Sequence, residues 1–405
     1  MIVTCIFLSF TNMKQTIAHI LLLLLSWTGL AAQQNVGPAA SAATVTSPVV
    51  NENNTVTFRL AAPKAKSVAV IGDWTEKAGA DIPMKKGKDG VWTLTTAPLS
   101  SEMYTYRFVV DGVTVIDPAN PFTRRDVNSV FSIFYINGPQ ADYYQVHDVP
   151  HGNVEQVWYH SDRLNMSRRI QVYLPAGYDK ARTNYPVLYL LHGSGGDENA
   201  WMELGHVSRI MDNLIAQGKA EPMIVVMPNG NSSKQAAPGE TSENLSYRPA
   251  MTNRLPGIKD GEYELSFPEI VAFIDQHYKT VADKKHRAIA GLSMGGKHSL
   301  TISANFPDMF DYIGLFSAGF PKKESQYEAV RDIDAKLKVQ AEKGYRLYWV
   351  GCGVDDQFDI HDPARAFAEK MQAMGGNTEF HSSSKGHVWS NWRQYLLDFA
   401  PKLFK

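Results

Sequence analysis

The chain carries a G-x-S-x-G turn directly after a short apolar strand, in the sequence RAIAGLSMGG at residues 287–296. Such a turn is so sharp that side chains at positions 291 and 295 would clash with neighbouring backbone, which explains the two glycines. It would lift the hydroxyl of Ser293 above the sheet. The helix expected from about Met294 to Asn305 would point its N-terminal amides at the place where negative charge forms. The motif predicts a nucleophile elbow, although a G-x-S-x-G alone does not establish catalysis.

Length and charge limit what kind of protein this can be. The 405 residues exceed one ordinary domain, so two domains plus a leader are expected, and a 44% apolar composition supports a real core. Lys and Arg total 40 against 41 Asp and Glu. Because neither sign dominates, there is no basic field for a nucleic acid and no polybasic face for anionic lipid. We expect no nucleic-acid partner.

The N-terminus has the pattern of a secretory signal. An apolar run at residues 17–29 follows Lys14 and precedes the small residues of positions 30–32, with cleavage expected near Ala32. Met13 is the more natural start. The run is shorter than the roughly 20 apolar residues that span a bilayer, and no cysteine follows it for lipid attachment. We therefore expect a signal peptide at 1–32, a bacterial periplasmic or secreted location, and no membrane anchor after cleavage.

Cysteine content agrees with a large exported enzyme. Only Cys5 and Cys352 occur, and Cys5 would leave with the leader. The mature chain could then form no internal disulfide and would depend on the size of its core.

Two patterns of hydrophobicity follow a spacer at 33–50, which is rich in Ala, Ser, Thr and Pro. Residues 51–137 read as short alternating strands with turn signals, such as Asp111-Gly112, and predict a small β-sandwich. Residues 138–155 are expected to be a linker. From 156 to 405, strands alternate with helical stretches, which predicts an α/β domain with a mostly parallel sheet.

The first domain resembles the immunoglobulin-like E-set modules of carbohydrate-binding module family 48. The resemblance rests on these motifs: FRLAAP at 58–63, GDW at 72–74, DGVW at 89–92, YTY at 104–106, VVDG at 109–112 and DPANP at 117–121. Trp74 and Trp92 could stack on sugar rings, but sandwich tryptophans also fill cores and domain interfaces, so glycan binding stays open.

A serine nucleophile needs a base and an acid, which in the α/β-hydrolase topology follow in the order Ser, Asp or Glu, His. After Ser293, a strand at 345–350 runs into GCGVDD, where Asp356 is favoured over Asp355 as the acid. The next strand, near 378–381, is followed by a loop that ends in His387, the candidate base.

Other histidines have simpler explanations. His298 lies on the helix leaving the elbow, His381 falls within a strand, and His192 is expected to be a packed loop residue. His361 precedes Asp362-Pro363, which read as an N-cap and first-turn proline.

The oxyanion donors are expected to be the backbone amides of Met294 and Ser194, with Gly193 allowing the turn after the strand at 186–191. The sequence has no H-E-x-x-H, no C-x-x-C and no phosphate loop, so no metal and no cofactor is expected.

The second domain resembles carbohydrate esterase family 1, the feruloyl and acetylxylan esterases related to esterase D, enterochelin esterases and mycolyltransferases. The matching motifs are YLPAGY at 173–178, LLHG at 190–193, RAIAGLSMGG at 287–296, GVDD at 353–356 and GHVWSNWR at 386–393. The resemblance implies a triad of Ser293, Asp356 and His387. Asn more usually precedes the catalytic Asp, and Asp355 stands there instead, which keeps the acid open.

Residues 228–262 form a long polar stretch of the kind that serves as a lid or pocket wall. The residues expected either to form a slot for an aromatic acyl group or to pin the loop are Trp201, Tyr247, Met251, Leu255 and Trp389. The leading hypothesis is a serine esterase that releases ferulic acid from plant cell-wall xylan or its oligosaccharides. Acetylxylan esterase, siderophore esterase, mycolyl-type acyltransferase and a non-catalytic glycan-binding domain are the alternatives.

Because every candidate catalytic group lies in the second domain, the first is expected to act only through stability or substrate contacts. Its removal is therefore expected to leave hydrolysis of small soluble esters largely intact.

Overall fold

The computed structural model describes residues 45–75, 79–241, 261–321 and 327–405. Residues 47–405 form one compact unit. The expected signal peptide at 1–32 and most of the spacer lie outside the described residues. So do Tyr247, Met251 and Leu255. Within the described ranges, no helix has the length and apolar character needed to cross a bilayer.

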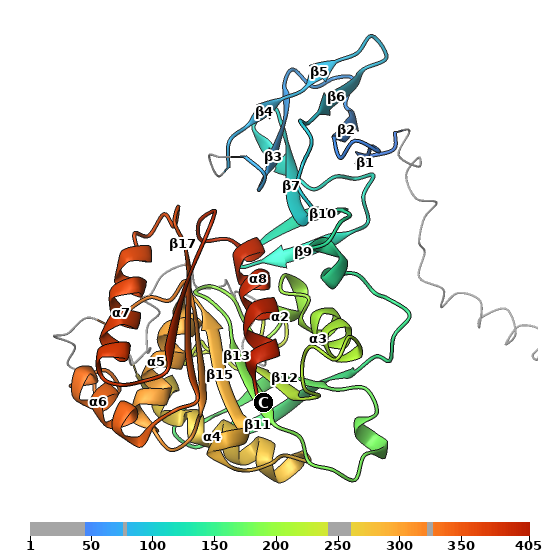
Figure 1. The fold of residues 1–405 in the computed structure, drawn as a ribbon. Helices are drawn as coiled ribbons and strands as arrows, with labels where there is room; N and C mark the ends of the chain where they lie inside the picture. The colour runs from blue at the N-terminus through green and yellow to red at the C-terminus, as the bar shows by residue number, and fades with distance from the viewer. Residues whose placement is uncertain (1–44, 76–78, 242–260, 322–326) are drawn as a thin grey trace, which may run out of the picture. The chain divides into compact units, whose positions relative to one another are not determined.

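The first domain is a β-sandwich of two antiparallel sheets (Figure 1). One sheet has the order β1-β2-β6-β5, and the other β4-β3-β7-β10-β9, with β8 paired to β7. The strands are β1 (Val49–Val50), β2 (Val56–Ala61), β3 (Val68–Gly72), β4 (Ile82–Pro83), β5 (Lys85–Lys86), β6 (Val91–Thr95), β7 (Glu102–Val110), β8 (Val113–Val115), β9 (Thr123–Asp126) and β10 (Ser129–Ile136). The sandwich thus begins inside the range predicted as spacer. β1, β4, β5 and β9 have only two to four residues each, which is too few for a clear alternating pattern in the sequence.

The core of the sandwich comes from strict alternation along its longest strand. Tyr104, Tyr106 and Phe108 of β7 point inward and are buried. Trp92 is also buried and donates its Nε1–H to the Ala62 carbonyl at 2.9 Å. Trp74 stacks on a buried phenylalanine, Phe58, with ring centroids 5.3 Å apart. Both candidate sugar-stacking tryptophans therefore pack within the sandwich.

The second domain is built on an eight-stranded sheet of order β11-β12-β14-β13-β15-β16-β17-β18. The strands are β11 (Asn153–Ser161), β12 (Met166–Leu174), β13 (Val187–Leu191), β14 (Ile224–Pro228), β15 (Arg287–Leu292), β16 (Tyr312–Phe316), β17 (Leu347–Gly353) and β18 (Thr378–Ser383). All neighbours from β14 to β18 pair in parallel, whereas β12 pairs antiparallel with β11 and β14.

The stretch predicted as a linker at 138–155 is partly ordered into the fold. It contains a 3-10 helix, η1 (Ala141–Tyr144), and its last three residues already belong to β11. Tyr144 is fully buried, because it packs with the core of the second domain. A proline-rich composition with few apolar residues did not reveal this single anchoring side chain.

Helices cover both faces of the large sheet (Figure 1). One face packs against α4 (Glu262–His277), α5 (Met294–Asn305), α6 (Ile333–Lys343) and α7 (His361–Ala373). The other packs against α2 (Ala200–Glu203), α3 (Val207–Ala216) and α8 (Trp389–Phe399).

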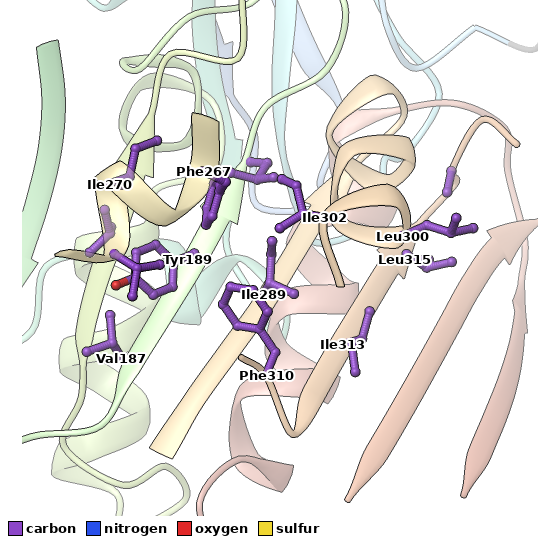
Figure 2. Close-up of a cluster of buried hydrophobic side chains, with 14 of the residues drawn as sticks. Val187, Tyr189, Phe267, Ile270, Ile289, Leu300, Ile302, Phe310, Ile313 and Leu315 are labelled. Atoms are coloured by element: carbon purple, nitrogen blue, oxygen red, sulfur yellow. The ribbon is translucent and has the colours of Figure 1, made fainter. Parts of the chain in front are cut away.

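Successive side chains along a strand point to opposite faces of the sheet, so one strand contributes to both cores. In β13, Val187, Tyr189 and Leu191 join the first core, whereas Leu188 and Leu190 join the second. Figure 2 shows the first core, where side chains of β13, β15 and β16 meet α4 and α5. Strands buried on both sides in this way are typical of parallel sheets covered by helices. The predicted fold class is confirmed.

The sandwich and the second domain share buried contacts. Met103 and Ile133 of the sandwich belong to the same apolar core as α3 and α8. Glu102 and Arg393 form an ion pair of 2.8 Å in which both side chains are only 2% exposed. The Arg393 guanidinium also donates to the Leu204 carbonyl at 2.7 Å. A paired charge thus lies within an otherwise apolar interface.

We expect Arg393→Met to lower the free energy of unfolding by about 3–5 kcal/mol, because it leaves the Glu102 carboxylate buried without a counter-charge. Adding Glu102→Gln should recover part of that loss. Urea unfolding followed by circular dichroism measures the effect. Lys338→Met, which breaks an exposed ion pair with Glu342, serves as control and should cost less than about 1 kcal/mol. A similar cost for both single variants would contradict the role of the buried pair.

Candidate active site

Ser293 sits at a strained turn between β15 and α5. Its φ of 52° and ψ of −113° lie outside the regions that non-glycine residues prefer. A Cβ at Gly291 would lie 2.5 Å from the Gly295 backbone, and a Cβ at Gly295 would lie 2.5 Å from the Leu191 carbonyl oxygen. Only hydrogen atoms fit at these two positions. The glycine spacing in the sequence therefore reflects direct backbone contact.

The loop after β13 lies against this elbow. A Cβ at Gly193 would come within 2.4 Å of Leu292 Cδ1 and 3.4 Å of Ser293 Cβ. The positive φ of the loop, 77°, occurs at Gly195. Gly193 was predicted to allow the turn, but the structure shows that it is needed for close approach and that Gly195 makes the turn. Among the described residues, the amides of Ser194 and Met294 donate to no recorded acceptor.

His387 and Asp356 form a close polar contact beside the cavity. His387 Nδ1 lies 2.8 Å from Asp356 Oδ2, and the Asp356 side chain is fully buried. The other carboxylate oxygen accepts the Phe358 amide at 3.0 Å. Asp355, by contrast, is exposed. Because the ring donates from Nδ1, its Nε2 is left as the atom that can accept a proton.

Further contacts hold the His387 loop in place. The backbone amide of His387 donates to Gln357 Oε1 at 3.1 Å. The ring lies edge-on between Phe358 and Trp392, with centroid distances of 4.8 and 4.9 Å. Strand β17 continues to Gly353, three residues beyond its predicted end, so the loop carrying Asp356 is shorter than expected.

Ser293 and His387 line one cavity of about 220 Å³. Between the Ser293 hydroxyl and the His387 ring, no hydrogen bond is recorded in the described part of the chain. Catalytic hydrogen bonds in unliganded enzymes are often long and tighten only with substrate. The apolar part of the cavity wall consists of Val127, Ala200, Leu204, Leu292, Phe358, Trp389 and Trp392, and the charged part consists of Arg125, Asp126, Asp197 and Glu203.

The predicted pocket residues divide into three groups. Trp389 lines the cavity. Trp201 does not line the cavity. It is only 1% exposed, donates its Nε1–H to the Leu191 carbonyl at 3.0 Å, and packs edge-on against Trp389. Its assignment to substrate binding is therefore wrong. The other three predicted pocket residues, Tyr247, Met251 and Leu255, lie outside the described residues.

Sequence reasoning missed several cavity residues. Phe358 and Trp392 could have been found, since one lies two residues after Asp356 and the other lies one helical turn after Trp389. The three residues Arg125, Asp126 and Val127 come from β9 and the turn after it, in the sandwich. Nothing in their local pattern signals a site more than 150 residues further along the chain.

The rival histidines have structural partners. His192 is 1% exposed, donates from Nδ1 to the Gly193 carbonyl and accepts the Gly230 amide at Nε2, at 2.8 and 2.7 Å. His298 pairs with Glu264 at 2.9 Å. His381 lies in β18 and pairs with Glu379. His361 is the first residue of α7, so the predicted N-cap at Asp362 is wrong by two residues.

Two neighbouring groups have shifted acidities. Burial lowers the pKa of His192 to about 4 and keeps its ring neutral. Burial, with the nearby Asp356 carboxylate, raises the pKa of the Cys352 thiol to about 12. In the described ranges, no group of three or more His, Cys, Asp or Glu side chains is placed to hold a metal ion.

Comparison with known protein families identifies the family of this chain. A putative esterase family matches residues 161–403. The chain belongs to this esterase family. Carbohydrate-binding module 48, the isoamylase N-terminal domain, matches residues 43–120.

Individual relatives point the same way. The endo-1,4-beta-xylanase/feruloyl esterase of Xylanibacter ruminicola is 34% identical over 88% of this chain and 46% of the relative. Endo-1,4-beta-xylanase Y of Acetivibrio thermocellus is 27% identical over 60% of this chain and 22% of the relative. The chain thus spans less than half of the length of these two curated relatives.

Solved structures share the fold. A ferulic acid esterase is 28% identical with a TM-score of 0.51, over 62% of this chain and 97% of its own. The enterobactin esterase of Shigella flexneri is 17% identical with a TM-score of 0.63, over 91% of this chain and 99% of its own, which is a likeness of fold alone.

We expect the buried His192 to make the protein less stable in acid. The folded state resists protonation of this ring down to about pH 4, whereas the unfolded chain takes up the proton near the reference value of 6.5. Stability should therefore fall as pH drops through this window, by up to roughly 1.4 kcal/mol per pH unit for one proton.

Urea unfolding between pH 7 and 4.5 tests this for the wild type and His192→Gln. The variant loses a hydrogen bond and should be less stable at pH 7, but its stability should fall less steeply with acid. Equal slopes for the two proteins would contradict the expectation.

Proposed function

We propose that the protein hydrolyses hydroxycinnamoyl esters, such as feruloyl groups on plant xylan and its oligosaccharides, with Ser293, His387 and Asp356 as the catalytic triad. The observation that carries the proposal is the 2.8 Å contact between His387 Nδ1 and the buried Asp356, on a histidine that lines the same cavity as Ser293. The feruloyl esterase named among the relatives, at 34% identity, supports the substrate class.

The geometry suggests how the residues would act. Nε2 of His387 takes the proton from Ser293 as the hydroxyl attacks the ester carbonyl, while Asp356 stabilises the imidazolium and holds its orientation. The amides of Met294 and Ser194 would donate to the oxyanion. The ester C–O bond then breaks, and His387 gives its proton to the sugar oxygen, so that the sugar leaves as an alcohol. A water molecule, activated by the same ring, releases the acid from the acyl-enzyme.

The cavity wall favours an aromatic acyl group. Phe358, Trp389 and Trp392 surround the base, and the Phe358 side chain is exposed despite its size. An exposed aromatic ring at a cavity mouth offers a flat surface for stacking. The charged wall that includes Asp126 and Glu203 supplies acceptors for phenolic or sugar hydroxyls. Export of the chain by its N-terminal signal would bring it to such a substrate.

We expect Ser293→Ala and His387→Ala each to lower kcat on methyl ferulate by roughly 10³-fold or more, without loss of fold. Asp356→Asn should lose far more activity than its exposed neighbour variant Asp355→Asn, because only the first disturbs the His387 contact. Steady-state kinetics and circular dichroism measure both. Comparable losses for the two aspartate variants would overturn the assignment of the acid.

We expect methyl ferulate to be the best substrate in a panel that also holds acetylated xylan and a catecholate siderophore ester. Phe358→Ala should lower kcat/KM for methyl ferulate about tenfold more than for 4-nitrophenyl acetate, since only the larger acyl group stacks on the ring. Phe122→Ala removes an equally exposed ring outside the cavity lining and is the control. Faster turnover of acetylated xylan or the siderophore ester would replace the feruloyl assignment, and ester transfer to an added alcohol in preference to water would indicate an acyltransferase.

A further inference from the structure

The sandwich places a hairpin turn against the loop that carries Ser194. Strand β9 lies beside α2 (Figure 1), and the cavity wall includes Arg125 and Asp126 at the end of β9 and Val127 in the turn before β10. Val127 has a φ of 52°, which is unfavourable for a β-branched residue. Backbone strain of this kind persists only where surrounding contacts hold it.

Val127 lies against the turn that Gly195 makes in the loop after β13. A Cβ at Gly195 would lie 2.8 Å from Val127 Cγ1, so Val127 fills the space that a side chain on the loop would otherwise occupy. Gly195 directly follows Ser194, whose amide is the proposed second oxyanion donor. The contact therefore restricts the position of this loop on the side that faces the sandwich.

Arg125 also connects the hairpin turn at Val127 to the loop after β13. One guanidinium nitrogen donates to Asp197 Oδ2 at 2.6 Å, and the other donates to the Val127 carbonyl at 2.9 Å. The Asp197 side chain is only 2% exposed. Its second oxygen accepts the amide of Asn199 at 3.0 Å, which leaves the arginine as the charged partner of a buried carboxylate.

The loop is held from its other side by the catalytic domain itself. His192 donates to the Gly193 carbonyl, and Asn231 Nδ2 donates to the Gly196 carbonyl at 2.8 Å. These contacts fix the two ends of the short segment. The segment between them, which includes Ser194, is contacted by the hairpin.

We propose that Arg125 is a positioning residue for ester hydrolysis: through Asp197 it holds the Gly193–Asp197 loop so that the Ser194 amide can receive the oxyanion. The proposal rests on the serine mechanism proposed above. It makes the N-terminal module part of the catalytic apparatus, and it revises the expectation that removing the sandwich leaves hydrolysis of small esters intact.

The test compares Arg125→Gln, Arg125→Lys, Asp197→Asn and the Arg125→Gln/Asp197→Asn double variant in the full-length chain, with 4-nitrophenyl acetate as substrate. This small ester lacks the sugar and hydroxycinnamoyl groups that a cavity-wall arginine could bind in a larger substrate. Arg124→Gln is the matched control, because Arg124 precedes Arg125 on β9 but pairs with Glu203 at 3.5 Å and does not line the cavity. A second readout is the rate at which Ser293 is phosphonylated by a 4-nitrophenyl phosphonate. Thermal melting of each variant is measured in parallel.

Arg125→Gln should lower kcat by about 10-fold to 100-fold with little change in KM, since the oxyanion contact forms only in the transition state. Phosphonylation should slow by a similar factor. Arg125→Lys should recover only part of the rate, because an ammonium group cannot reach both acceptors in the same fork geometry. The double variant should lose no more than the worse single variant, because both changes remove the same contact.

Two results would overturn the proposal: an unchanged kcat and phosphonylation rate in Arg125→Gln, or a loss that Arg124→Gln reproduces along with the same drop in melting temperature. The feruloyl assignment fails separately, since a wild type inactive on methyl ferulate can still show Ser293-dependent hydrolysis of the acetate. If Ser293→Ala is as active as the wild type on both esters, the serine mechanism itself fails, and the proposal about Arg125 with it.

Discussion

The structure of the catalytic domain depends on one place where two backbones touch. Gly291 and Gly295 bring the elbow so close to the end of β13 that no side chain fits between them. This contact presses Ser293 into its strained conformation and sets the distance to the loop at Gly193. Strand β13 pairs with β15 along five successive residues, so the two turns that follow these strands are delivered to the same edge of the sheet. The cavity is built at that edge because parallel strands end there together.

His387 is held by packing as much as by its contact with Asp356. His387 lies between Phe358 and Trp392, and Trp392 in turn contacts Trp389 edge-on at 5.2 Å. Behind Trp389 stands the buried Trp201. This row of aromatic rings joins a loop histidine to the core beneath α8. A loop residue needs such support, since a shift of about 1 Å at a reacting group can cost two orders of magnitude in rate.

Buried charges join the N-terminal module to the catalytic domain at two points. Glu102 pairs with Arg393 in the core of the interface, and Arg125 pairs with Asp197 at the cavity. An ion pair that loses one buried partner is strongly destabilised, so both contacts penalise any separation of the two domains. A module that resembles a carbohydrate-binding domain is thereby coupled to the loop beside Ser293. Its candidate sugar-stacking tryptophans pack inside the sandwich instead.

The sequence by itself determined the features that depend on local patterns. The G-x-S-x-G turn, the order of Ser293, an aspartate and His387, and the change from short alternating strands to strands with crossover helices are all visible along the chain, because each arises from neighbouring residues. Tertiary structure decided the rest. Whether Asp355 or Asp356 contacts the His387 ring depends on which carboxylate is buried against it, and two adjacent aspartates in a loop do not reveal this. Trp201 proved to be a core residue, and the hairpin at Arg125 became a cavity wall, because burial and proximity between distant segments are set by how whole elements pack.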